Sequence, residues 1–229
     1  MKTSCASLIG WHCFCNTNQQ KPSSIYTMKR ILIAIIATVA ALTSMAQAPS
    51  AVLDKCVAAI SSRGGVTANY SVATAQGTSK GSIAMQGTKF RVISPEAKCW
   101  YDGKTQWSWS PVTSEVNITS PTPDDLQLTN PIAAAQHFKA NFNMKKAKAK
   151  TANTYVIKLT PKKKKDAIKT LWLYFDEKTS LLRTARFEMS DKSVYTIKIT
   201  DYKNKSLPAS TFTFDKSQVP AGTTIADLR

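Results

Sequence analysis

Few residues of this sequence have the types and spacing that enzyme chemistry requires. After residue 46 the chain has one histidine, His137, and two cysteines, Cys56 and Cys99, which lie far apart in the sequence. No nucleophile motif, glycine-rich phosphate loop or metal-ligand spacing accompanies them. The acidic pairs Asp124-Asp125 and Asp176-Glu177 fall in expected turns, where aspartate is favoured for backbone reasons. We therefore expect a protein that is not an enzyme and that holds neither a metal ion nor a cofactor.

The feature that suggests binding is a cluster of tryptophans. Three of the five lie close together in KCWYDGKTQWSWSP (98–111), at Trp100, Trp107 and Trp109. Asp102-Gly103 favours a two-residue hairpin turn. That turn pairs Trp100 with Thr105 and Trp107 with Lys98, which places all three indoles on one face of a sheet. A three-residue loop with a bulge would instead move Trp100 to the other face.

The elements that must position these residues are mostly strands. The stretch 49–62 is predicted to be an amphipathic helix, and a second helix is expected with Asn130 as its N-cap and Pro131 in its first position. Together the strands form a mainly β (α+β) antiparallel sheet of about eleven strands, which is too large to stay flat and should curl into a barrel or deep half-barrel. Period-two patterns predict strands at 66–75, 78–87, 88–94, within 98–111, and at 114–120, 142–150, 154–161, 168–176, 181–189, 194–200 and 211–215.

Residues 28–46 have the layout of a secretory signal peptide. Lys29 and Arg30 precede an apolar run over 31–42, and the small residues Ser44 and Ala46 follow it. As a helix this run spans about 18 Å, less than the roughly 30 Å of a bilayer core, which disfavours a membrane anchor. We predict that residues 1–27 are an upstream extension, that cleavage follows Ala46, and that 47–229 form a single exported domain.

The formal net charge of +17 favours anionic partners. The densest basic groups are Lys162 to Lys165 and the alternating Lys146, Lys148 and Lys150. A solvated outer face explains such lysines equally well, and nucleic acid is not an expected partner of an exported protein. A secreted module that binds anionic polymers through the Lys-rich face is one alternative function.

Several of these segments resemble a known family. The stretch WYDGKTQWSWSPVTSEV (100–116), preceded by GTKFRVISPEAK (87–98) and followed by STFTFDKSQVPAGTTIADLR (210–229), is similar to the periplasmic outer-membrane lipoprotein carriers, the LolA family. VIKLTPKKKKDAIKTLWLYFD (156–176) fits a strand-loop-strand segment of the same family. The resemblance covers residues 49–229 and implies an unclosed β-barrel with a helical lid over a hydrophobic cavity.

The resemblance also implies a function and a site. A monomer in the periplasm of a Gram-negative bacterium would shield the acyl chains of lipoproteins between an inner-membrane release complex and the outer membrane, where an acceptor is possible. A sensor of lipids or lipoproteins on the same fold is the nearest alternative, and the tryptophan face could also be plain core. The candidate residues for binding acyl chains are Tyr70, Phe90, Trp100, Trp107 and Trp109. Those for the lid are Val52, Cys56, Ile60, Ile132 and Phe138.

One departure from the family affects the lid. Family members often carry an Arg-Pro pair shortly before the position of Phe90, and that arginine bonds the lid shut. Here Gln86 and Gly87 stand at those positions, and a neutral latch is weaker than a charged one. A disulfide between Cys56 and Cys99 could tether the lid instead, although two buried free thiols are the alternative. The predicted hairpin places Cys99 opposite Trp100, which conflicts with a lid over the tryptophan face.

Overall fold

Strands with alternating burial dominate the chain, as the period-two patterns predict. The computed structural model describes residues 47–61, 64–127, 130–163 and 166–229, which belong to a compact unit spanning Gln47–Arg229. In the strand Ile168–Asp176, Leu171, Leu173 and Phe175 are buried in the main core, while Trp172 and Tyr174 between them are half-buried. The predicted signal peptide and upstream extension lie outside the described residues.

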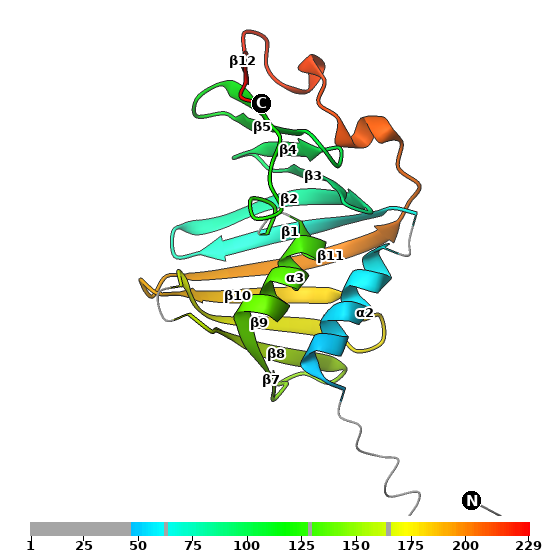
Figure 1. Ribbon diagram of the computed structural model, residues 1–229, viewed down its shortest axis with the longest axis vertical. Coiled ribbons are helices and arrows are strands. Elements are labelled where there is room, and N and C mark those ends of the chain that lie inside the picture. Colours follow the sequence, from blue (N-terminus) through cyan, green and yellow to red (C-terminus); the bar gives the residue numbers. More distant parts are fainter. Residues whose placement is uncertain (1–46, 62–63, 128–129, 164–165) are drawn as a thin grey trace, which may run out of the picture. The chain divides into compact units, whose positions relative to one another are not determined.

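The described elements are two α-helices, two short 3-10 helices and one sheet of twelve strands (Figure 1). The helices are α2 (Pro49–Ser61) and α3 (Pro131–Asn141), with η1 (Ala209–Phe212) and η2 (Lys216–Gln218) near the C-terminus. The strands are β1 (Val66–Thr74), β2 (Gly77–Gln86), β3 (Lys89–Ile93), β4 (Lys98–Tyr101), β5 (Gln106–Ser110), β6 (Glu115–Thr119), β7 (Phe142–Ala147), β8 (Thr154–Pro161), β9 (Ile168–Asp176), β10 (Leu182–Met189), β11 (Val194–Asn204) and β12 (Thr224–Asp227).

The sheet is open, with the order β12-β6-β5-β4-β3-β2-β1-β11-β10-β9-β8-β7. All neighbours are antiparallel except β12 and β6, which are parallel. Both α-helices lie across the same face of the sheet (Figure 1). The fold is therefore the expected unclosed half-barrel with a helical lid.

Local sequence signals explain both helices. The side chain of Asn130 accepts hydrogen bonds from the backbone N–H groups of Ile132 and Ala133, and Pro131 occupies the first turn of α3. This confirms the predicted N-cap, which satisfies donors that the helix itself leaves unpaired. On α2, Val52, Cys56 and Ile60 are buried on one side of the helix, as its amphipathic pattern predicts.

The tryptophan hairpin is wider than predicted. Trp100 pairs directly with Trp107, so the loop holds four residues, 102–105, and the predicted pairing with Thr105 is wrong. The reason is that Asp102 closes the loop through its side chain, which accepts hydrogen bonds of 2.8 Å from the backbone N–H groups of Lys104 and Thr105. The register shifts by two positions, and an even shift keeps the three indoles on one face.

The C-terminal segment (residues 205–227) also differs from expectation. The predicted strand at 211–215 is wrong, because Pro208 leads into η1 and Asp215 caps η2. The strand β12 was not predicted, and β7 ends three residues before its predicted end. A four-residue strand with mostly exposed side chains carries little alternation, and β12 forms only by pairing with the distant β6. Figure 1 draws this segment in orange to red.

The two faces of the sheet have separate apolar cores. On the face that carries α2 and α3, residues of both helices pack with β2 to β4 and β7 to β10 into the main core. On the opposite face, Ala84 packs with Leu207 and Phe212 of the C-terminal segment. The helices thus cover one side of the sheet and the C-terminal segment covers part of the other.

Candidate functional site: an apolar cavity beneath the helices

A cavity of about 380 Å³ lies between the two α-helices and the sheet. The two helices and Gln127 contribute one wall, and β1, β2, β3, β9, β10 and β11 contribute the other. None of the residues around it is Asp, Glu, Lys, Arg or His. They are Leu53, Cys56, Val57, Ile60, Val66, Ala68, Tyr70, Val72, Ile83, Met85, Val92, Gln127, Pro131, Ile132, Ala134, Ala135, Phe138, Leu173, Phe175, Leu182, Ala185, Phe187, Ile197, Ile199 and Tyr202.

Two β-bulges turn additional side chains into this cavity. β11 has one extra residue opposite β1, at Asp201, whose φ is 54°. Because a bulge shifts the alternation of a strand by one position, Tyr202 joins Ile197 and Ile199 on the cavity wall. A second bulge, in β10 opposite β9, likewise shifts the alternation so that Leu182 joins the cavity wall. The Tyr202 hydroxyl donates a hydrogen bond of 2.8 Å to the Leu182 carbonyl, which ties the two bulges together.

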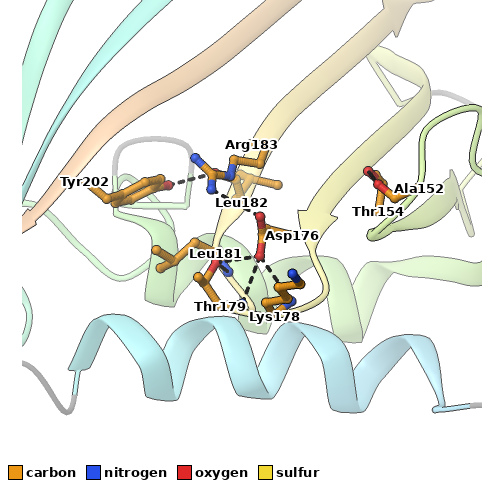
Figure 2. A network of polar contacts seen from close by, with 9 residues as sticks. All are labelled: Ala152, Thr154, Asp176, Lys178, Thr179, Leu181, Leu182, Arg183 and Tyr202. Atoms are coloured by element: carbon orange, nitrogen blue, oxygen red, sulfur yellow. Dashed lines mark hydrogen bonds and ion pairs between the residues drawn. The ribbon is translucent and has the colours of Figure 1, made fainter.

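The β9–β10 turn fixes the position of Leu182 beside helix α2 (Figure 2). Asp176 accepts hydrogen bonds from the backbone N–H groups of Lys178 (3.0 Å) and Thr179 (2.9 Å), and the guanidinium of Arg183 donates another (3.1 Å). The bonds from Thr179, its N–H first, and from Arg183 lower the pKa of the Asp176 carboxyl. The turn is therefore braced by one carboxylate outside the cavity, and the cavity wall itself stays uncharged.

Burial keeps the titratable groups of the cavity neutral. Desolvation raises the pKa of the Cys56 thiol to about 11, and it also raises the pKa of the Tyr202 hydroxyl. A thiol with such a pKa is a poor nucleophile near neutral pH, because the reactive species is the thiolate. Cys56 therefore behaves as part of an apolar wall.

The model of a protein family described as outer membrane lipoprotein carrier protein LolA matches residues 39–191. The chain belongs to the LolA family. No curated protein sequence matches the chain.

Solved structures add a likeness in fold. An uncharacterized conserved protein from Thermus thermophilus is 10% identical, with a TM-score of 0.55 over 77% of this chain and 96% of that chain. A LolA superfamily protein from Nitrosomonas europaea is 13% identical, with a TM-score of 0.38 over 71% of this chain and 96% of that one. A putative outer membrane lipoprotein-sorting protein domain from Vibrio parahaemolyticus is 10% identical, with a TM-score of 0.43 over 72% of this chain and 95% of that chain. The first of these likenesses shows the fold alone.

The tryptophans do not line the LolA-type cavity, which corrects the placement predicted for Trp100, Trp107 and Trp109. Trp100 is 1% exposed and packs edge-on against Phe214 of the C-terminal segment, with ring centroids 5.5 Å apart. Its neighbours in β4, Cys99 and Tyr101, belong to the main core on the helix side. The pairing within the hairpin determines which residues share a face, but it does not determine which face the lid covers.

The remaining lining candidates lie on the helix side of the sheet. Tyr70 lines the cavity. Phe90 is 1% exposed within the main core, 5.3 Å from the Tyr101 ring by centroids, and it does not reach the cavity. The apolar side chains that form most of the wall were missed, although the alternation at Ile197 and Ile199 is the signal that could have identified them.

The lid candidates divide between cavity and core. Cys56 and Ile60 of α2 and Ile132 and Phe138 of α3 line the cavity, while Val52 packs in the main core. Cys56 and Cys99 are both free thiols, so the structure contains no tether of the predicted kind. Cys99 lies on the helix side with Cys56, so the predicted conflict between lid and tryptophan face disappears.

Two neutral amide side chains, one of them at the predicted latch position, donate hydrogen bonds to backbone carbonyls of other segments. Gln86, at the latch position, donates a hydrogen bond of 2.7 Å to the backbone carbonyl of Gly64, just after α2. Asn130 uses its oxygen to cap α3 and its Nδ2 to donate a bond of 2.9 Å to the Thr88 carbonyl in the β2–β3 turn. Asn130 was predicted as a cap, but its second contact was missed because it depends on the fold.

The described residues contain neither a metal-binding cluster nor a membrane-spanning helix. No group of three or more His, Cys, Asp or Glu side chains in these parts of the chain could hold a metal ion. In the same residues, no helix has the length and apolar character needed to cross a membrane. Of the predicted lysine run, Lys164 and Lys165 lie outside the described residues, and Lys162 donates to the Ala140 carbonyl at the end of α3.

Proposed function

We propose that this protein carries lipoproteins through the periplasm and that the cavity beneath α2 and α3 shields their acyl chains. The observation that carries the proposal is a cavity beneath the helices with no charged residue in its wall, in a chain of the LolA family. In this proposal residues 28–46 direct export, the carrier is a monomer that performs no enzymatic reaction, and cargo comes from an inner-membrane release complex. An outer-membrane acceptor would receive it.

The size of the cavity sets a condition on loading. At about 380 Å³ it is near the lower end of the roughly 300–1,000 Å³ typical of small-molecule pockets. Three acyl chains with roughly 45 methylenes represent on the order of 35 kcal/mol of gross hydrophobic free energy, at about 0.8 kcal/mol each. They also need more room than this cavity gives. Loading a triacylated lipoprotein therefore requires α2 and α3 to move away from the sheet.

Two of the polar bonds near the lid are weak enough to permit that movement, while a third, from the Lys162 ammonium to the Ala140 carbonyl at the end of α3, is charge-assisted and would have to break or move with the helix. The bonds of Gln86 and Asn130 are neutral, and a typical neutral hydrogen bond contributes about 0.5–1.5 kcal/mol net. The apolar contacts that Ile60 and Phe138 make with the wall would be replaced by contacts with acyl chains. The chains can thus offset most of the cost of opening the lid.

Lipid analysis of the protein isolated gently from its own host tests the proposal. We expect copurifying acylated peptides or lipoproteins, identified by mass spectrometry. Ala185→Phe, which fills the cavity from β10, should remove them. Thr184→Phe is the matched control, because it adds the same ring one residue away on the opposite face of the strand.

Two results would count against carriage by this cavity. One is equal cargo on the two variants, which would move the binding site elsewhere. The other is a native protein that contains only free phospholipid, which would favour the lipid-sensing alternative.

A further inference from the structure

A strip of basic and aromatic side chains crosses the outer face of four strands. Lys145 of β7 pairs directly with Lys158 of β8, Lys158 with Trp172 of β9, and Trp172 with Arg186 of β10. Directly paired residues share a face. Lys158 lies between the buried Ile157 and Leu159, and Trp172 lies between the buried Leu171 and Leu173. The basic strip (Lys145, Lys158, Trp172 and Arg186) therefore points away from α2, α3 and the cavity.

The strip keeps its positive charges close together. Lys158 Nζ lies 5.7 Å from the centre of the Trp172 ring, and the Arg186 guanidinium lies 4.8 Å from it on the neighbouring strand. Lys145 and Lys158 are like charges directly opposite each other, an arrangement that destabilises a sheet. Local arrangements that cost stability are expected at functional sites.

The nearest acidic partner is already engaged. Glu188 forms an ion pair of 2.9 Å with Lys169, which a bulge in the β9–β10 pairing brings beside it. That bond and the charges of Arg186 and Lys158 lower the pKa of the Glu188 carboxyl. Within the described parts of the chain, no carboxylate forms an ion pair with a cation of the strip.

We infer that the basic strip is a docking surface for an anionic phospholipid bilayer. Its three cations, on β7, β8 and β10, lie along a line across the strands rather than around a pocket, which suits a flat array of phosphates. A half-buried tryptophan between cations suits the headgroup region, where amphipathic aromatic rings are favoured. Lys169 and Lys198, exposed on the flanking rows, extend the positive surface. Clusters of four to eight basic residues are typical of peripheral binding to such membranes.

Docking through this face has a consequence for the lid. The strip and the two helices lie on opposite faces of the same strands, so a bilayer bound at the strip would leave α2 and α3 free to move. The inference uses no property of the cavity, and it holds whether the cavity carries lipoproteins or other lipids.

Vesicle binding tests the inference with the protein in the form that its host accumulates. We expect it to cosediment with vesicles of phosphatidylcholine and phosphatidylglycerol, to bind pure phosphatidylcholine poorly, and to dissociate as salt rises. Each basic residue near such a surface contributes about fivefold in affinity. The double variant Lys158→Gln, Arg186→Gln should therefore bind at least about tenfold more weakly. Lys104→Gln, Lys216→Gln removes the same charge from exposed positions elsewhere and should keep its affinity within about twofold.

The outcomes separate this inference from the proposed function. Equal binding to both vesicle types, or equal losses in the two double variants, would overturn the docking surface. Strip-dependent binding to an acidic protein without binding to the anionic vesicles would also overturn it. Copurifying acylated cargo is measured on the same variants, and Lys158→Gln, Arg186→Gln should keep its cargo. If Ala185→Phe loses cargo but still binds vesicles, both proposals are supported. If the native protein has no cargo but binds vesicles through the strip, the proposed function is wrong and the docking surface is not affected.

Discussion

The two faces of the sheet at the β4–β5 hairpin pack against different parts of the molecule. Toward the helices, the sheet presents the main core and, farther along, a cavity lined mostly by Val, Ile, Leu and Ala side chains. On the other face, Trp100 is fully packed under the C-terminal segment, with Phe214 against its ring. The clustered tryptophans thus lie on the face that the C-terminal segment covers, whereas the cavity on the other face is lined mostly by aliphatic side chains, with Phe and Tyr rings among them. Clustering of tryptophans in the sequence therefore indicates packing here, and it does not identify the cavity.

The largest effect should come from the closed face. Phe212 is fully buried between Leu207 and Ala84, and removing its ring leaves a cavity. We expect Phe212→Ala to lower the free energy of unfolding by about 3–5 kcal/mol, measured by urea denaturation. Folded molecules should still bind a fluorescent fatty acid with native affinity.

A phenylalanine on the other face sharpens that contrast. Phe138→Ala removes the same ring from the cavity wall, so it should alter fatty-acid affinity more than Phe212→Ala does. The contrast between the faces fails if folded Phe212→Ala protein loses binding, or if Phe138→Ala leaves affinity unchanged.

The next largest effect should come from Asn130, which joins the lid helix α3 to the sheet. Asn130→Ala removes both the cap of α3 and the bond to Thr88. An N-cap contributes about 1 kcal/mol and a neutral hydrogen bond about the same, so local opening should become easier by about 2 kcal/mol. Hydrogen exchange of α3 amides measures this opening. Exposed Asn143 of β7 gives the control Asn143→Ala, which should leave α3 unchanged; equal exchange in both variants would show that the amide does not hold the lid.

Local signals predicted most of this fold. The strands β8 and β9 begin and end where the alternation places them, and Asn130 caps α3 as expected. What failed depends on distant contacts. Whether the lid covers the Trp100 face or the Cys99 face is decided by where the C-terminal segment packs, and no local pattern contains that information. The same holds for the bulge at Asp201, which adds Tyr202 to the cavity wall by altering the pairing of β11 with β1.

A smaller effect on stability should appear as the pH is raised, because the Cys56 thiol is buried on the helix side of the sheet. Burial raises the pKa of Cys56 from 9.0 to about 11. A raised pKa means that this thiol adds stability below about pH 9, and that the contribution is lost as pH rises toward 11. At about pH 10 the loss is on the order of 1 kcal/mol. We expect Cys56→Ala to show a shallower fall in unfolding free energy between these pH values; parallel curves for the two proteins would contradict the burial of the thiol.

The smallest effect should come from the charged link between the two lid helices. Lys139 of α3 and Asp54 of α2 form an ion pair, but their side chains are 37% and 59% exposed. Water and salt screen such pairs, which typically contribute about 0–1 kcal/mol. We expect Lys139→Gln to change α3 exchange by less than about 0.5 kcal/mol, and high salt to erase the difference from the native protein. If Lys139→Gln instead loosened α3 as much as Asn130→Ala does, the lid would be held by charge at its outer rim. The neutral bond to the sheet would then have little part in closing the cavity.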